Sequence, residues 1–140
     1  MDLASAPWKA NYPPGLAPDT TLEGWPVHSI VDRAAQRWPD KEAVRFRAAR
    51  VSFATLSRET DRAARAFLAA GAGPGTRVAL LLPNTIYHLF AFFGALKAGA
   101  TVVHLSPLDS RRVLCHKLAD SGARLLVTTN IGELVAKNAP

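Results

Sequence analysis

The stretch VALLLPNTIYHLFAFFGALKAGATVV, residues 78–103, decides the fold, because it allows two very different structures. Residues 78–96 carry no charge, and an apolar run of this length is able to span a bilayer as one helix. Such a helix would carry Pro83 near its start, where proline removes a backbone donor. Pro83 instead separates a buried strand, RVALLL, from a helix capped by Asn84 or Thr85. We therefore expect two elements of a soluble α/β fold.

The residues that follow repeat this alternation of strand and helix. The helix IYHLFAFFGALKAG leads to the strand ATVVHLS, and the helix SRRVLCHKLADSG leads to the strand ARLLVTT. Three buried strands separated by helices imply right-handed βαβ crossovers and a parallel sheet. The last residues, NIGELVAKNAP, predict the start of another helix capped by Asn130. Residues 28–140 are therefore predicted to form an incomplete α/β subdomain.

The residues before this unit predict an arm, a helix and a hairpin. Residues 1–27 are rich in proline and predict an extended arm that lies over the surface. Ser29 and Asp32 have the spacing of a capping box, which starts a helix that Pro39 ends. The segments EAVRF and RVSF predict a hairpin, and a longer helix is expected from about Ala54 to Ala70.

Composition narrows the classes of partner and the compartment. Seventeen Lys and Arg against eleven Asp and Glu leave a formal charge of +6, but the cations are interleaved with acids, which is typical of a solvated surface. We therefore expect no nucleic-acid partner, and at most peripheral membrane contact through Trp8, Lys9 and Tyr12. No secretory signal is recognised, and a cytoplasmic location is expected by default. The single cysteine, Cys115, is interpreted as a buried or half-buried thiol.

No residue is identified as catalytic, cofactor-binding or metal-binding. The segment GAGPGT, residues 71–76, follows a helix and precedes a strand, which reverses the order of a phosphate-binding loop and predicts a plain turn. The four histidines lack the spacing of a zinc site; they are His28, His88, His104 and His116. His104 is the most interesting, because open α/β sheets bind ligands at the carboxyl ends of their strands. A structural role for His104 is nevertheless the stronger interpretation.

Three segments together resemble the N-terminal portion of the adenylate-forming acyl-CoA synthetases of the AMP-binding family. They are PGTRVALLLPN, GALKAGATVV and LADSGARLLV, and the resemblance extends from about Trp8 to Val127. The leader PWKANYPPG is similar to the openings of bacterial medium- and long-chain fatty acid–CoA ligases. Several positions depart from the family pattern by losing an acid or a polar side chain, which indicates a divergent member; they are Ser52, Phe53, Thr55, Thr76, Ser106, Val113 and Leu114.

The resemblance implies a parent enzyme that activates a carboxylic acid, a fatty acid, with ATP and then transfers the acyl group to CoA. ATP, Mg²⁺ and CoA are the cofactors implied for that parent. The family's phosphate-handling loop and its lysine and aspartate motifs are not found in these 140 residues, so no catalytic residue is carried over and no cofactor is expected to bind. We therefore expect an N-terminal fragment that is inactive by itself, with a homo-oligomer left open. The alternative is a free-standing α/β binding or interaction module.

Overall fold

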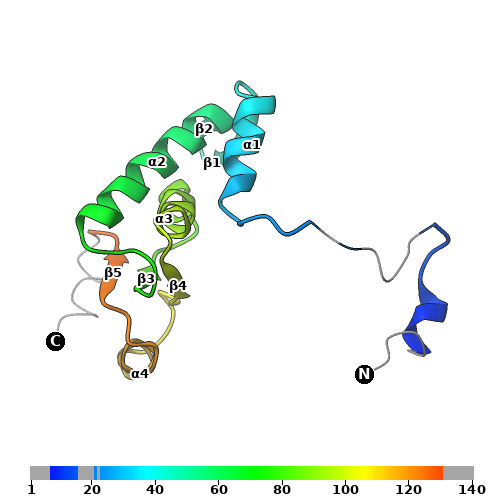
Figure 1. The fold of residues 1–140 in the computed structure, drawn as a ribbon. Helices are drawn as coiled ribbons and strands as arrows, with labels where there is room; N and C mark the ends of the chain where they lie inside the picture. Colours follow the sequence, from blue (N-terminus) through cyan, green and yellow to red (C-terminus); the bar gives the residue numbers. More distant parts are fainter. Residues whose placement is uncertain (1–6, 16–20, 22, 131–140) are drawn as a thin grey trace.

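The computed structural model describes residues 7–15, 21 and 23–130. Its helices and strands from α1 onward form one body, and the short 3₁₀ helix η2 (Pro7–Asn11) lies apart from that body in Figure 1. The extended arm predicted for residues 1–27 remains a prediction, because several of its residues fall outside the described ranges. The helix predicted to begin at Asn130 likewise falls on residues 131–140, outside the described part.

A three-stranded parallel sheet forms the centre of the body. Strand β3 (Arg77–Leu81) lies between β4 (Thr101–His104) and β5 (Leu125–Thr128). Both neighbours run parallel to β3 over four paired positions, which confirms the parallel sheet predicted from the sequence. Two helices connect these strands: α3 (Ile86–Lys97) leads from β3 to β4, and α4 (Arg111–Ser121) leads from β4 to β5.

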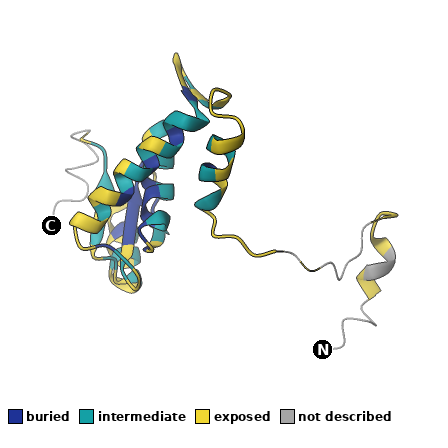
Figure 2. Ribbon diagram, turned by 45° about the horizontal axis from the view of Figure 1, so that its top comes forward, coloured by how far each residue is buried: buried dark blue, intermediate teal, exposed yellow. Residues whose placement is uncertain are grey.

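Strand β3 is buried on both faces, as its continuous apolar run predicts. Val78 and Leu80 pack with residues of α3, whereas Ala79 and Leu81 pack with Leu114 of α4. Figure 2 shows this buried strand between the helices. Residues 78–103 therefore form most of β3, a turn, helix α3 and most of β4. In the described ranges, no helix is long and apolar enough to cross a membrane.

A hairpin and two helices complete the body. Helix α1 (Ser29–Arg37) precedes the antiparallel strands β1 (Glu42–Phe46) and β2 (Ala49–Ser52), and α2 (Phe53–Ala69) follows them. The hairpin turn places Arg47 at a φ of 53°, the left-handed conformation that tight hairpin turns require. Ser52 caps α2, because its Oγ accepts a hydrogen bond of 3.2 Å from the backbone N–H of Thr55.

The capping box predicted for α1 is wrong. Ser29 is the first helical residue, and its hydroxyl donates a 2.7 Å hydrogen bond to the carbonyl of Pro26. Asp32 turns instead toward α3, where both of its carboxylate oxygens accept from Lys97 Nζ at 2.7 and 2.8 Å. The competing interaction comes from a lysine 65 positions later, so the local spacing of Ser29 and Asp32 does not reveal it.

Candidate functional site

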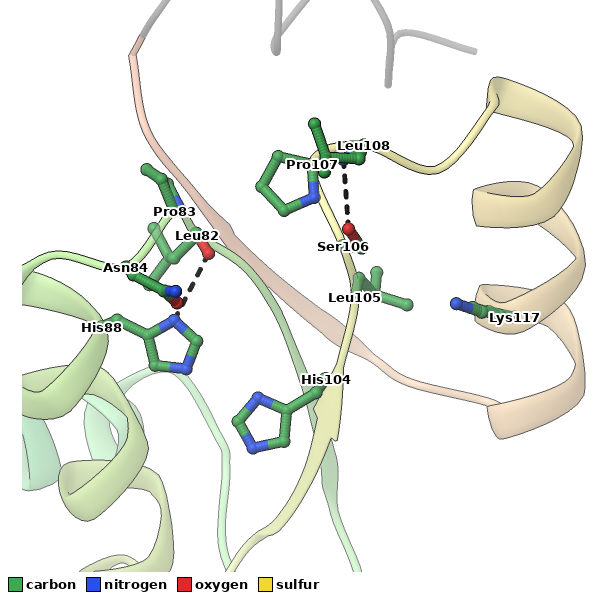
Figure 3. A pocket seen from close by; sticks show the side chains of 10 residues that line it. All are labelled: Leu82, Pro83, Asn84, His88, His104, Leu105, Ser106, Pro107, Leu108 and Lys117. Atoms are coloured by element: carbon green, nitrogen blue, oxygen red, sulfur yellow. Dashed lines mark hydrogen bonds between the residues drawn. The ribbon is translucent and has the colours of Figure 1, made fainter.

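A cleft opens where β3 and β4 end, at the edge of the sheet where open α/β proteins bind ligands (Figure 3). Its volume is about 510 Å³. The segments that follow the two strands form most of its wall, together with one residue of α3 and one of α4. The lining residues are Leu82, Pro83, Asn84, His88, His104, Leu105, Ser106, Pro107, Leu108 and Lys117.

Two prolines shape this cleft by ending the strands that lead into it. Pro83 follows Leu82 directly after β3, and Pro107 follows Ser106 shortly after β4. Because proline has no backbone N–H, neither segment continues the sheet, and the chain turns away on both sides. Ser106 Oγ accepts a 3.2 Å hydrogen bond from the N–H of Leu108, which holds the second turn in place.

His88 and His104 meet in the cleft, although they lie on different elements. Their rings stack with centroids 5.3 Å apart and planes 13° apart. Nδ1 of His88 lies 3.3 Å from the carbonyl oxygen of Leu82, which can only accept, so Nδ1 carries the proton and donates. Nε2 of a neutral His88 therefore has a free lone pair. The sequence identified His104 as the interesting histidine but gave no sign of its partner.

The pKa of His104 is lowered by its surroundings. Burial lowers the pKa of His104 below its ordinary value of 6.5, and the adjacent His88 lowers it further, because two imidazolium ions this close would repel. The neutral form of His104 is therefore favoured, and a neutral imidazole is able both to accept and to donate a hydrogen bond.

The other polar groups of the cleft limit what it is able to do. The ammonium group of Lys117 lies 2.6 Å from a carboxylate oxygen of Asp109, so its charge is largely neutralised. Within residues 7–15, 21 and 23–130, no three His, Cys, Asp or Glu side chains come together as metal ligands. The arrangement offers a mostly apolar cleft with two imidazoles, an amide and a hydroxyl, which is the composition of a small-molecule binding site.

The remaining sequence candidates lie elsewhere. His28 precedes α1 and His116 is exposed on α4, so neither reaches the cleft. Cys115 is exposed, and the interpretation of a buried or half-buried thiol is wrong. The reason is helical geometry: Leu114 and Leu118 fill the inward face of α4, and the position after Leu114 points outward.

The glycine-rich segment forms the predicted turn. Residues 71–76 connect α2 to β3, and Gly71 and Gly75 have φ angles of 80° and 81°, which suit residues without a side chain. The segment does not open a helix, so its N–H groups are not arranged as those of a phosphate-binding loop.

The chain is similar to known proteins both in sequence and in fold. The family model described as AMP-binding enzyme matches residues 31–140. The long-chain-fatty-acid–CoA ligase of Bacillus subtilis (strain 168) is 30% identical over 125 residues, which cover 89% of this chain and 22% of that protein. The feruloyl-CoA synthase of an Amycolatopsis species is 41% identical over 108 residues, which cover 77% and 21%. The chain thus spans less than a quarter of the length of these relatives.

Solved structures give the same assignment. The N-terminal domain of FACL13 from Mycobacterium tuberculosis superposes with a TM-score of 0.74 at 25% identity, covering 84% of this chain and 32% of that one. A fatty acyl CoA synthetase from Mycobacterium tuberculosis gives a TM-score of 0.73 at 25% identity, covering 78% and 22%. The resemblance recognised in the sequence is confirmed: the chain belongs to the adenylate-forming acyl-CoA synthetases of the AMP-binding enzyme family, and it corresponds to their N-terminal portion.

Proposed function

We propose that this chain is the first part of an ATP-dependent acyl-CoA synthetase that acts on fatty acids. The observation that carries the proposal is the family match over residues 31–140, on a chain that spans about a fifth of its relatives. In the proposed reaction a carboxylate attacks ATP to give an acyl-adenylate and pyrophosphate. The thiol of CoA then displaces AMP to give the acyl-CoA. ATP, Mg²⁺ and CoA would act in the complete enzyme.

These residues would contribute a scaffold rather than the reacting centre. Release of pyrophosphate requires oriented N–H groups and cations around the triphosphate. The segment 71–76 lacks the helix that would aim its N–H groups at an anion, and the ammonium group of Lys117 in the cleft is held by Asp109. We therefore propose that the 140 residues do not catalyse the reaction without the remaining domain.

The choice of a fatty acid as substrate rests on the extent of the matches. The long-chain-fatty-acid–CoA ligase of Yersinia pestis covers 93% of this chain at 33% identity. The feruloyl-CoA synthase is more similar, at 41% identity, but covers 77%. The mostly apolar lining of the cleft, with Leu82, Leu105 and Leu108, is also compatible with an acyl chain. An aromatic acid is therefore the competing substrate.

The test is to read the coding sequence beyond Pro140 and to express the protein that it encodes. The purified protein would be incubated with ATP, Mg²⁺, CoA and either ferulate or fatty acids of increasing length, and acyl-CoA products would be identified by mass spectrometry. We expect fatty acyl-CoA from the longer protein and none from residues 1–140. A product with ferulate alone would overturn the fatty-acid assignment. A stop codon directly after Pro140 would favour the alternative, a binding module without catalysis.

A further inference from the structure

The β1–β2 hairpin concentrates positive charge around its turn. Residues 45–50 include the arginines Arg45, Arg47 and Arg50, whereas Glu42 is the one acid of residues 42–52. The side chains of Arg45 and Arg50 are 59% and 69% exposed. Figure 2 shows the exposed tip of the hairpin beyond the end of α2 at which that helix begins. Three arginines against one glutamate leave the hairpin with a net positive charge that faces solvent.

The hairpin itself does not neutralise these arginines. Arg45 and Arg50 are cross-strand partners, and like charges directly opposite each other destabilise an antiparallel pair. Glu42 accepts hydrogen bonds of 2.8 and 3.2 Å from Arg45 but lies 3.6 Å from Arg50, so it offsets the repulsion only in part. Arg47 has no carboxylate oxygen within 4.0 Å among the described residues. Positive charge is therefore left available at the turn.

A mostly apolar hollow adjoins these arginines. Its volume is about 390 Å³, and it lies between β1 and the start of α3. Its apolar side chains are half-buried: Val44 and Phe46 come from β1, and Ile86 and Leu89 come from α3. Arg45 forms part of its wall, so positive charge and apolar area meet there. We call the three arginines and this hollow the hairpin surface.

We propose that the hairpin surface binds an acidic segment of a partner protein. Carboxylates of that segment pair with Arg47 and Arg50, and one of its apolar side chains fills the hollow. Arginine beside a pocket for an apolar anchor is a common arrangement at protein interfaces. A nucleic acid fits less well, because its phosphate backbone has no apolar group for the hollow. A bilayer also fits less well, because insertion requires apolar side chains that protrude, and these line a concave surface.

The proposal does not depend on the proposed ligase reaction, and its test is a binding titration followed by fluorescence anisotropy. The probe is a labelled synthetic peptide in which glutamates surround leucines spaced one helical turn apart. Two analogues carry glutamine in place of each glutamate or serine in place of each leucine. We expect the purified protein to bind both analogues more weakly than the parent peptide. Binding of the parent peptide should also weaken as the salt concentration rises.

Two double variants of the protein locate the binding. R47Q/R50Q should weaken binding of the parent peptide about tenfold, since each partly exposed ion pair contributes about threefold. The matched control, R58Q/R62Q, removes the same charge from α2, where both arginines pair with Glu59, and should change binding less than about twofold. All four side chains are exposed, so circular dichroism melting curves should match that of the unchanged protein.

Four results would overturn the proposal. Equal losses in R47Q/R50Q and R58Q/R62Q would show that net charge alone explains the binding. Undiminished binding of the serine analogue would show that the hollow receives no apolar side chain. Absence of measurable binding to the parent peptide would remove the acidic segment as the partner. Tighter binding to a single-stranded oligonucleotide or to phosphatidylglycerol vesicles than to the peptide would identify a different class of partner.

Discussion

At the scale of single residues, Gly94 sets how closely two helices approach. It is buried where α3 crosses α2, and a Cβ built on it would lie 2.5 Å from the Cβ of Ala63 and 3.1 Å from the backbone nitrogen of Ala64. Atoms do not approach this closely, so any side chain here would force the helices apart. α2 and α3 make the most extensive helix contact of the described body, and Gly94 is therefore a packing residue.

The first prediction concerns this contact. G94A should lower the free energy of unfolding by about 1–2 kcal/mol, because overpacking costs about 1–3 kcal/mol and the better helix propensity of alanine offsets part of it. Urea denaturation measures the change. The double variant A63G/G94A should be less destabilised than the sum of the two single variants, since it removes the colliding Cβ. Strict additivity, or no loss in G94A, would contradict the close approach.

The second prediction concerns His104. Its pKa is lowered in the folded state, so below the ordinary value of 6.5 the unfolded chain binds the proton more readily. Stability should therefore fall as the pH drops from about 6.5 toward the folded-state pKa. H104F keeps a ring beside Phe92 and His88 but cannot titrate, so its stability should depend less on pH over this range.

Melting temperatures between pH 7.5 and 5 measure this dependence. H116Q changes an exposed histidine on α4 and serves as the control, with the pH profile of the unchanged protein. A profile of H104F that equals that of the unchanged protein would show that the stacked pair does not resist protonation.

At the scale of elements, ion pairs to Lys97 of α3 link α3 to α1 and α2. We call this group of ion pairs the Lys97 junction. Lys97 Nζ contacts carboxylate oxygens of Asp32 on α1 and Asp61 on α2, and Ser57 on α2 donates a 2.9 Å hydrogen bond to Asp32. Burial alone would raise the pKa of Asp32, but the hydrogen bonds from Lys97 and Ser57 and the charge of Lys97 lower it below 3.8. Three helices therefore meet at one ammonium group.

The third prediction is that K97M destabilises the fold, because it removes both ion pairs of the Lys97 junction. We expect the free energy of unfolding to fall by about 1–2 kcal/mol, because two partly exposed carboxylates lose their shared partner. The stabilisation from Asp32 is present above its unfolded pKa and is lost as the pH falls below 3.8, so K97M and the unchanged protein should converge in acid.

Chemical denaturation at pH 7 and at pH 3 checks both statements. The matched control is E59Q, which removes an acid paired with the exposed cations Arg58 and Arg62 and should cost less than about 0.5 kcal/mol. If K97M lost no more stability than E59Q, the junction would be only a surface ion pair.

Helices and strands were predictable from the sequence where residues within or next to the element determine its bounds. The continuous apolar run of β3, the proline that follows it and the left-handed glycines at the ends of α2, α3 and α4 place these elements correctly. What the sequence did not reveal are contacts between residues far apart in the chain. The pairing of Asp32 with Lys97, and that of His88 with His104, depend on how the elements pack, and neither pairing leaves a pattern in spacing.

At the scale of the whole molecule, the described sheet has three strands, with β4 and β5 at its edges. The cleft at its carboxyl end has a mostly apolar wall and two imidazoles, and its one ammonium group, that of Lys117, is paired with Asp109. The sequence predicted the parallel sheet and the family, because both rest on motifs that lie within these residues. It predicted no catalytic residue among these 140 positions, and this remains a prediction.

The most direct test of this account is fatty-acid-dependent exchange of labelled pyrophosphate into ATP, which isolates the adenylation step. It would be measured with Mg²⁺ on residues 1–140 and on the longer protein encoded by the same reading frame. We expect exchange by the longer protein and none above background by the 140 residues. Exchange by residues 1–140 alone, abolished by EDTA, would contradict it and would place an adenylating centre within this chain.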